Sequence, residues 1–247
     1  MKKFLKILKY IFLILLLLAL TLSGIVIYKG YSVYQEAISE ISVQDKISNI
    51  KSNNNFLTID NLPKDFINAV IAIEDNRFYS HSAIDFRSIG RAIYVNLSNF
   101  ELLEGGSTIT QQLSKNIFFT QRKEATRKIA EIFLAFDLEK TLSKDEILEL
   151  YVNTNYYGDG YYGIKEAANG YFKKEPIEMD LYECTLLAGV PNAPSVYAPT
   201  INPDLASERQ IQVINAMVKY NYLTDSQKED LLNQIEEKQS EHNNSES

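Results

Sequence analysis

The N-terminus carries an almost unbroken apolar run from Tyr10 to Tyr28. As a helix, this run is about long enough to span ~30 Å of hydrocarbon. Four lysines precede it, and lysine-rich flanks stay in the cytoplasm, so the residues after Tyr28 are expected outside. A cleaved signal peptide is the alternative, but its apolar region usually covers ~7–15 residues and ends at a small-x-small site. We therefore predict a cytoplasmic segment over 1–9 and an uncleaved transmembrane helix over 10–28.

The rest of the chain follows mainly the 3.6-residue period of helices, which predicts a mainly α fold. The polar residues 29–55 are expected to form a partly helical stalk or linker, and one domain is expected over 56–235. Only two short segments, 56–59 and 92–97, alternate with period two and are weak strand candidates. Apolar periodicity and capping signals predict helices from Pro63 to Glu74, over 124–140, from Ser143 through Tyr151, from Asp180 to Pro191, and from Pro203 onward.

Composition restricts the function further. The formal net charge is −7 although four lysines precede the anchor, so the outer domain is acidic and a poor nucleic-acid binder. Cys184 is the only cysteine, which excludes an internal disulfide and a cysteine-based zinc site; its apolar surroundings predict a core residue. Residues 236–247 are rich in Glu, Asn, Ser and Gln, so this tail is predicted to be disordered.

Polar side chains are concentrated between Gly105 and Asn116, where two glycines precede hydroxyls, two carboxamides and Lys115. A core helix would not place so many polar groups together, and a solvated face would normally use Lys and Glu. The pattern favours a mobile loop that enters a helix whose polar start binds an oxygen-rich anion.

Two charged motifs flank this segment in the sequence. Glu74 and Asp75 stand at a predicted helix C-terminus, where acids oppose the helix dipole. They are either surface charges at a fraying end or functional groups, because a carboxylate beside Phe78 could act as a general base. Arg127 and Glu131 are neighbours at i,i+4; taken alone, an ordinary surface ion pair is the simpler interpretation.

Together, these motifs resemble the peptidoglycan glycosyltransferases (glycosyltransferase family 51), including their monofunctional transglycosylases. Glu-Asp-x-x-Phe-x-x-His at 74–81, Gly-x-Ser-Thr-Ile-Thr-Gln-Gln-Leu-x-Lys-Asn at 105–116 and Arg-Lys-x-x-Glu at 127–131 carry the resemblance. It continues in the segments 147–153, 157–172, 187–194 and 197–199, and covers about residues 57–220. The resemblance implies a lysozyme-like helical domain with a small jaw or flap and a cleft near the membrane.

The family's reaction implies roles for particular residues. Lipid II is polymerised into β-1,4 glycan strands with inversion at MurNAc C1 and release of undecaprenyl pyrophosphate. Glu74 would be the general base for the acceptor hydroxyl, and Glu131 the second catalytic acid, whose ion pairs hold cations and the donor sugar. Asp75 would be the residue to recruit a divalent metal, Mg or Mn. The implied substrate-binding residues are Asp75, Phe78, His81, Ser107, Thr110, Gln111, Gln112, Lys115, Asn116, Lys123, Arg127 and Lys128.

The implied partners are lipid II, the growing glycan strand, the membrane and the cell-wall synthesis machinery. Residues 96–106 are expected to form a flap that orders on substrate binding. Phe118 and Phe119 are expected either to enter the membrane interface or to pack in the core. Ala83 and Lys173 stand near positions where the family commonly has glycine.

Two other functions remain open from the sequence. A lytic enzyme on the same scaffold would need an acid for a sugar leaving group, but neither a cation cluster nor an anchor. A non-catalytic, membrane-anchored wall-binding protein would not need to retain Glu74, Lys115 and Glu131 together. A penicillin-binding domain is not expected in this sequence, because the Ser48–Lys51 match to Ser-x-x-Lys has no Lys-Thr-Gly partner.

Overall fold

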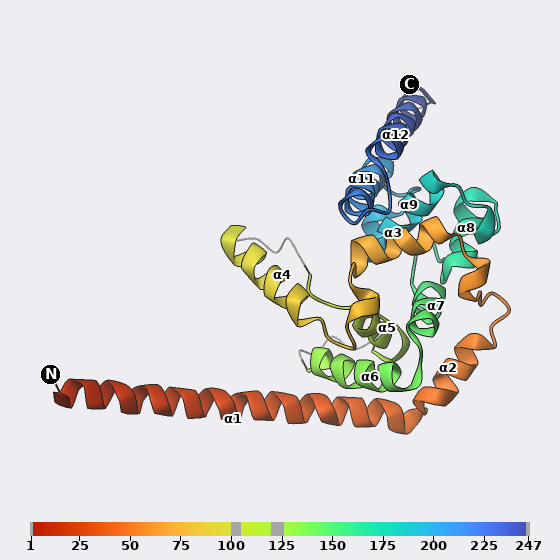
Figure 1. The fold of residues 1–247 in the computed structure, drawn as a ribbon. Helices are drawn as coiled ribbons and strands as arrows, with labels where there is room; N and C mark the ends of the chain where they lie inside the picture. Colours follow the sequence, from red (N-terminus) through yellow and green to blue (C-terminus); the bar gives the residue numbers. More distant parts are fainter. Residues whose placement is uncertain (1, 100–104, 120–125, 246–247) are drawn as a thin grey trace.

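The computed structural model describes residues 2–99, 105–119 and 126–245, and these residues form an all-helical molecule (Figure 1). The mainly α prediction is confirmed. No strand occurs in the described residues, where Tyr156 and Tyr162 form an isolated antiparallel bridge. Both strand candidates are wrong: residues 56–59 lead into a 3₁₀ turn, Ile59–Asn61, and residues 92–97 lie within helix α4, Phe86–Asn99. In α4 the apolar residues recur at helical spacing, which explains the misassignment.

The N-terminal helix α1, Lys2–Glu40, is long and apolar enough to cross a membrane, and it extends away from the domain (Figure 1). It continues well past Tyr28 and packs on α6, Arg127–Thr141. Gly30 permits the close approach, because a Cβ there would lie 2.4 Å from Ile129 Cβ. The segment expected as a stalk is therefore the second half of α1 followed by α2, Val43–Lys51, and part of it is buried in the domain core.

The core is built from helices that carry the site. Helix α3, Lys64–Glu74, packs on α9, Leu181–Gly189, and on α11, Pro203–Lys219. Helix α5, Ile109–Phe118, packs against both α6 and α7, Lys144–Thr154. Their fully buried side chains include Phe66, Leu113, Leu148 and Val213, and Cys184 is a buried core residue as predicted.

Capping explains why these helices begin where they do. Reciprocal capping boxes open three of them. In each, the side chain of the N-cap residue accepts from the backbone N–H of the residue three positions later, and the side chain of that residue accepts from the backbone N–H of the N-cap residue. The pairs are Thr108 with Gln111, Ser143 with Glu146, and Asp180 with Glu183. The smaller helices are α8, Ile164–Phe172, and α10, Pro194–Tyr197, with 3₁₀ turns at Phe78–Ser80, Pro176–Glu178 and Val190–Asn192.

Two further expectations can be compared with the structure. The predicted disordered tail is wrong for residues 236–245, which belong to α12, Asp225–Ser245. Leu231 and Ile235 are buried on the same helix, and Glu, Gln and Lys are good helix formers, so the helix continues beyond its buried part. Phe119 is fully buried and Phe118 packs against the core. Of the two placements expected for these side chains, the structure therefore has packing in the core.

Candidate active site

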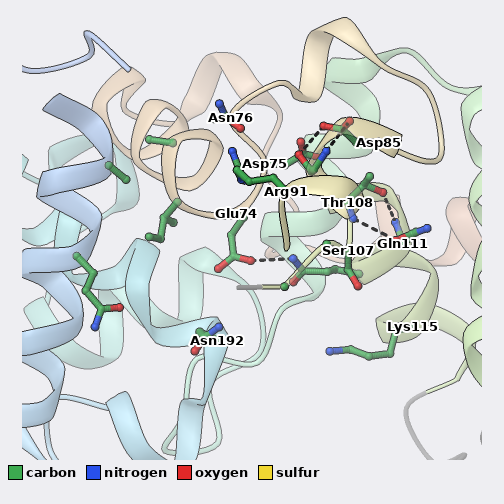
Figure 2. Close-up of a pocket in the computed structure, with 18 of the residues that line it drawn as sticks. Glu74, Asp75, Asn76, Asp85, Arg91, Ser107, Thr108, Gln111, Lys115 and Asn192 are labelled. Atoms are coloured by element: carbon green, nitrogen blue, oxygen red, sulfur yellow. Dashed lines mark hydrogen bonds between the residues drawn. The ribbon is translucent and has the colours of Figure 1, made fainter. Parts of the chain in front are cut away.

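A cleft of about 610 Å³ opens at the C-terminal end of α3. Its walls come from α3 and α4, from the loop 105–108 that leads into α5, from the start of α6 and from α11. Figure 2 shows Glu74 near the middle, with Lys115 reaching in from one side and Asn192 on the opposite wall. Six basic residues line the cleft beside four acidic ones, so this cavity in an acidic chain can hold an anion. The basic residues are Arg91, Lys115, Arg127, Lys128, Arg209 and Lys219.

Glu74 is held at only one of its two carboxylate oxygens. Its Oε2 accepts a hydrogen bond of 2.7 Å from the side-chain amide of Gln112 (Figure 2). Its Oε1 has no hydrogen-bond donor, and the nearest cation is the Arg209 guanidinium at 3.6 Å. The side chain is only 10 % exposed. Oε1 is therefore the oxygen on which a proton from a bound hydroxyl could be accepted.

Asp75 is hydrogen-bonded to two other segments of the site. One carboxylate oxygen is bonded to His81 Nε2 at 2.8 Å, and the other accepts from the backbone N–H of Ile109 at 3.1 Å. Burial opposes the charged imidazolium, but the bonds to Asp75 and to the Ser82 carbonyl outweigh it and raise the pKa of His81. Asp75 thus joins the end of α3 to the start of α5, which fixes Glu74 relative to Gln112.

Asp85 makes a second buried anchor in the cleft wall. It accepts from the Arg77 guanidinium, from the Ser88 hydroxyl at 2.6 Å and from the backbone N–H of Arg87 at 2.9 Å. Burial opposes ionisation, but the bonds from Ser88 and Arg77 prevail and lower the pKa of Asp85 well below its usual range. These contacts hold the start of α4 against the loop that follows α3.

The metal expectation rests on Asp75, which together with His81 and Asp85 offers ligand atoms within 4.8 Å of one another. Their ligand atoms already have hydrogen-bond partners. Asp75 is bonded at both oxygens, and Asp85 is bonded by the Arg77 guanidinium. A divalent ion would have to displace these donors, so the three residues do not fit a resident metal.

Glu131 is enclosed by positive charge on α6. Arg127 Nε lies 2.9 Å from Glu131 Oε1, and Lys128 Nζ lies 3.0 Å from Glu131 Oε2. The first contact is an ion pair whose N–H is not aligned for a hydrogen bond. The Glu131 side chain is 2 % exposed, whereas the two cations are 33 % and 48 % exposed and reach the cleft. Lys128 also donates to the Ser107 hydroxyl at 2.7 Å, which links α6 to the glycine-bearing loop. The buried acid therefore holds two cations at the cleft wall.

Several expected substrate contacts lie in this cleft. Ser107, Gln111, Gln112 and Lys115 all line it. Gln111 is nevertheless 2 % exposed, because its side chain accepts from the Thr108 backbone N–H in the capping box. Lys115 extends into the cavity (Figure 2), and it forms no ion pair among the described residues. A free ammonium beside an ion-paired wall suits an anionic ligand.

Other expected contacts lie elsewhere. Phe78 and Thr110 are fully buried; Phe78 packs in the core and Thr110 donates to Glu139 at 2.6 Å. Asn116 donates to Asn155 at 2.6 Å, and His81 sits behind Asp75, so neither lines the cleft. These four side chains support the site from behind. Lys123 lies outside the described residues.

Sequence reasoning missed part of the cleft. Arg209 and Lys219 come from α11, Arg91 comes from α4, and Asn192 follows α9. The apolar face of α11 was visible in the sequence, but nothing local indicated that its polar face returns to Glu74. Asn192 lies within the family-like segment 187–194, and this was the one signal that could have identified it.

Two positions at which the family commonly has glycine carry other residues in this chain, and the backbone accommodates both. Ala83 is not among the described residues with positive φ, so its Cβ causes no strain there, and its carbonyl accepts from Thr108 at 2.9 Å. Lys173 ends α8 with φ 58° and ψ 35°, the left-handed conformation that glycine favours at this position. The turn is kept despite the bulkier residue.

Comparisons with known proteins give the family of the chain. The transglycosylase family model matches residues 42–218. Penicillin-binding protein 1F of Bacillus subtilis is 40% identical over 208 residues, covering 81% of this chain and 29% of that protein. A Cupriavidus necator protein assigned by name to the transglycosylases is 42% identical over 175 residues, covering 71% and 75%. The chain belongs to the transglycosylase family.

Longer relatives share only this part of their length. Penicillin-binding protein 1A of Aquifex aeolicus is 43% identical over 178 residues, covering 72% of this chain and 24% of that protein. The chain thus spans less than a third of the penicillin-binding relatives it matches. The crystal structure of penicillin-binding protein 1A from Haemophilus influenzae gives a TM-score of 0.42 at 21% identity, covering 72% of this chain and 17% of that one.

Proposed function

We propose that the chain is a membrane-anchored peptidoglycan glycosyltransferase that polymerises lipid II into β-1,4 glycan strands. The observation that carries the proposal is Glu74, a carboxylate with one oxygen lacking a donor, inside a cleft rich in cations. The reaction needs a base for a sugar hydroxyl and positive charge for a pyrophosphate leaving group. Both requirements are met within one cavity.

Each chemical change has a group to serve it. The 4-hydroxyl of the acceptor GlcNAc gives its proton to Glu74 Oε1 as its oxygen bonds to C1 of the donor MurNAc. The C1–oxygen bond to undecaprenyl pyrophosphate breaks with its electron pair, and attack from the opposite face inverts the α-linked donor. Lys115, Arg127 and Lys128 stabilise the departing anion, which needs charge compensation more than a proton. Glu131 holds two of those cations in place.

A lysozyme-like lytic reaction is the competing proposal. It requires a carboxylic acid to protonate a sugar leaving group, usually with a second carboxylate nearby. Glu131 is ion-paired with Arg127 and Lys128, so its two oxygens hold cations rather than face a sugar leaving group. The cation-rich cleft also has no role in the cleavage of neutral glycosidic bonds.

The proposed location is supported by features of α1 and α4. Helix α1 is the candidate membrane span, and residues of α4 expose apolar side chains: Phe86, Ile93, Tyr94 and Leu97. In Figure 1 α4 extends from the domain on the side toward which α1 leaves it. Contact of both helices with one bilayer would place the cleft near the lipid tail of its substrate, with the N-terminus cytoplasmic and the domain outside. The glycan strand and the synthesis machinery are the proposed partners.

The test is polymerisation of purified lipid II by the full chain in detergent. Wild type should yield glycan polymer and release undecaprenyl pyrophosphate. Glu74→Gln should lower the rate by roughly 10²–10⁴-fold, the usual contribution of a general base. Shortening of preformed glycan strands without polymerisation would favour the lytic enzyme. Glycan binding with neither reaction would favour the non-catalytic wall-binding protein.

A further inference from the structure

A buried tyrosine stands behind the amide that holds Glu74. Tyr151 of α7 is 1 % exposed and does not line the cleft. Its hydroxyl donates to Oε1 of Gln112 at 3.1 Å, and Gln112 Nε2 donates to Glu74 Oε2 at 2.7 Å. The hydroxyl, the amide and the carboxylate therefore form one chain of hydrogen bonds from the core to the cleft.

The orientation of the Gln112 amide is constrained from both ends, by the carboxylate and by the tyrosine. A glutamine amide has an accepting end and a donating end, and only the donating end can bond a carboxylate. If the amide were turned over, its oxygen would face the Glu74 oxygen and repel it. Burial, and then the nearby Glu74 charge, raise the pKa of Tyr151 well above its usual value, so its hydroxyl keeps the proton that it donates. That proton is accepted by the amide oxygen, so the tyrosine adds to the preference for the orientation in which the amide N–H groups face Glu74.

We propose that Tyr151 is a positioning residue for the reaction: its hydroxyl orients the Gln112 amide, which holds Glu74 Oε2 and leaves Oε1 to accept the substrate proton. This inference rests on the proposed role of Glu74 as the base. Tyr151 itself touches no substrate, because its whole side chain lies in the core. Its effect should therefore fall on turnover rather than on substrate binding.

A neighbouring tyrosine provides a matched control. Tyr157 is also fully buried, but its hydroxyl donates to the Val152 carbonyl, at 3.4 Å, rather than to Gln112. Tyr151→Phe and Tyr157→Phe each remove one buried hydroxyl and leave the ring. A role that was only structural would make the two variants behave alike, whereas the positioning role separates them.

The kinetic test is a double-mutant cycle in the polymerisation assay. Tyr151→Phe should lower kcat about tenfold with KM little changed, the loss of roughly one net hydrogen bond, while Tyr157→Phe keeps wild-type kcat. In a Gln112→Ala background, Tyr151→Phe should have no further effect, because the group it orients is gone. Equal losses in both tyrosine variants, or a full additional loss in the Gln112→Ala background, would overturn the inference.

A spectroscopic test is independent of the activity. In the full chain labelled with ¹⁵N-glutamine, the Gln112 side-chain amide signals are those that disappear in Gln112→Ala. They should move in Tyr151→Phe and in Glu74→Gln, and stay in place in Tyr157→Phe. Unmoved signals in Tyr151→Phe would refute the positioning role even if polymerisation is confirmed. Moved signals with no polymerisation would support the hydrogen-bond chain and reject the proposed function alone.

Discussion

The two glutamates of the cleft differ in what surrounds them. Glu131 is enclosed by two cations, with Arg127 at 2.9 Å and Lys128 at 3.0 Å. Glu74 has one neutral amide donor at 2.7 Å, and its nearest cation, Arg209, is 3.6 Å away. Each is the buried carboxylate of a short motif, yet only Glu74 has an oxygen without a close donor or cation. The comparison supports the proposal that Glu74 reacts, whereas Glu131 organises the charge around it.

The largest effect expected beyond the loss of Glu74 itself comes from Glu131→Gln. Without this carboxylate, Arg127 and Lys128 lose the anion that fixes them, so the pyrophosphate is held in the wrong place. We expect kcat/KM to fall about 100-fold, because small misplacements can cost that much. Since both cations are partly exposed, the free energy of unfolding should fall by only about 1–2 kcal/mol. Initial polymerisation rates and thermal melts measure both quantities.

Glu139 provides the control for that variant. It lies on the same helix and is ion-paired with Lys144 at 2.7 Å, but it does not line the cleft. Glu139→Gln should therefore cost similar stability and leave kcat/KM within about twofold. If both variants lose activity in parallel with stability, Glu131 is a structural acid only, and the comparison with Glu74 fails.

A smaller effect is expected from Lys115→Met, which removes an ammonium but keeps the apolar stem. The loss of one charge-assisted contact with the departing anion should lower kcat/KM for lipid II about tenfold. Added salt should weaken wild type more than this variant, because screening acts on the missing charge. Lys140→Met, which removes an exposed lysine outside the cleft, should behave like wild type. An unchanged kcat/KM in Lys115→Met would remove this residue from the anion site.

The smallest effect concerns stability around Asp75. Because the folded-state pKa of His81 is raised, its stabilisation is fully present below about pH 6.5 and is lost as pH rises through the folded-state value. His81→Gln should therefore be less stable than wild type by about 1–2 kcal/mol near pH 6, with the difference shrinking toward pH 9. Thermal melts of the full chain at both pH values measure this. A difference that grows with pH would contradict the assigned protonation.

The sequence predicted those parts of the molecule that depend on local pattern. The helix ending at Glu74 and the two capping boxes at Ser143 and Asp180 were visible as periodicity and cap chemistry, and they occur in the structure. It was harder to judge from the sequence which polar side chains in a helix face the cleft and which face the core. Thr110 lies in the same polar segment as Ser107, but it faces the core and bonds Glu139.

Features set by distant contacts were not predictable. Arg209 reaches Glu74 only because α11 packs on α3, and no local signal in either helix indicates that pairing. The packing of α1 on α6 depends on the match of Gly30 with Ile129, which are far apart in the chain. The orientation of Gln112 by Tyr151 likewise needs α5 and α7 to be side by side.

The pH dependence of turnover tests the division of labour between the two glutamates most directly. Polymerisation by wild type, Glu74→Gln and Glu131→Gln would be measured at saturating lipid II across the acidic range. A general base must be unprotonated to work, so wild-type kcat should fall toward low pH. The account predicts that this fall of kcat toward low pH (the acidic limb of the pH profile) persists in Glu131→Gln and disappears from the residual rate of Glu74→Gln. Loss of the limb in Glu131→Gln, with its retention in Glu74→Gln, would contradict the account.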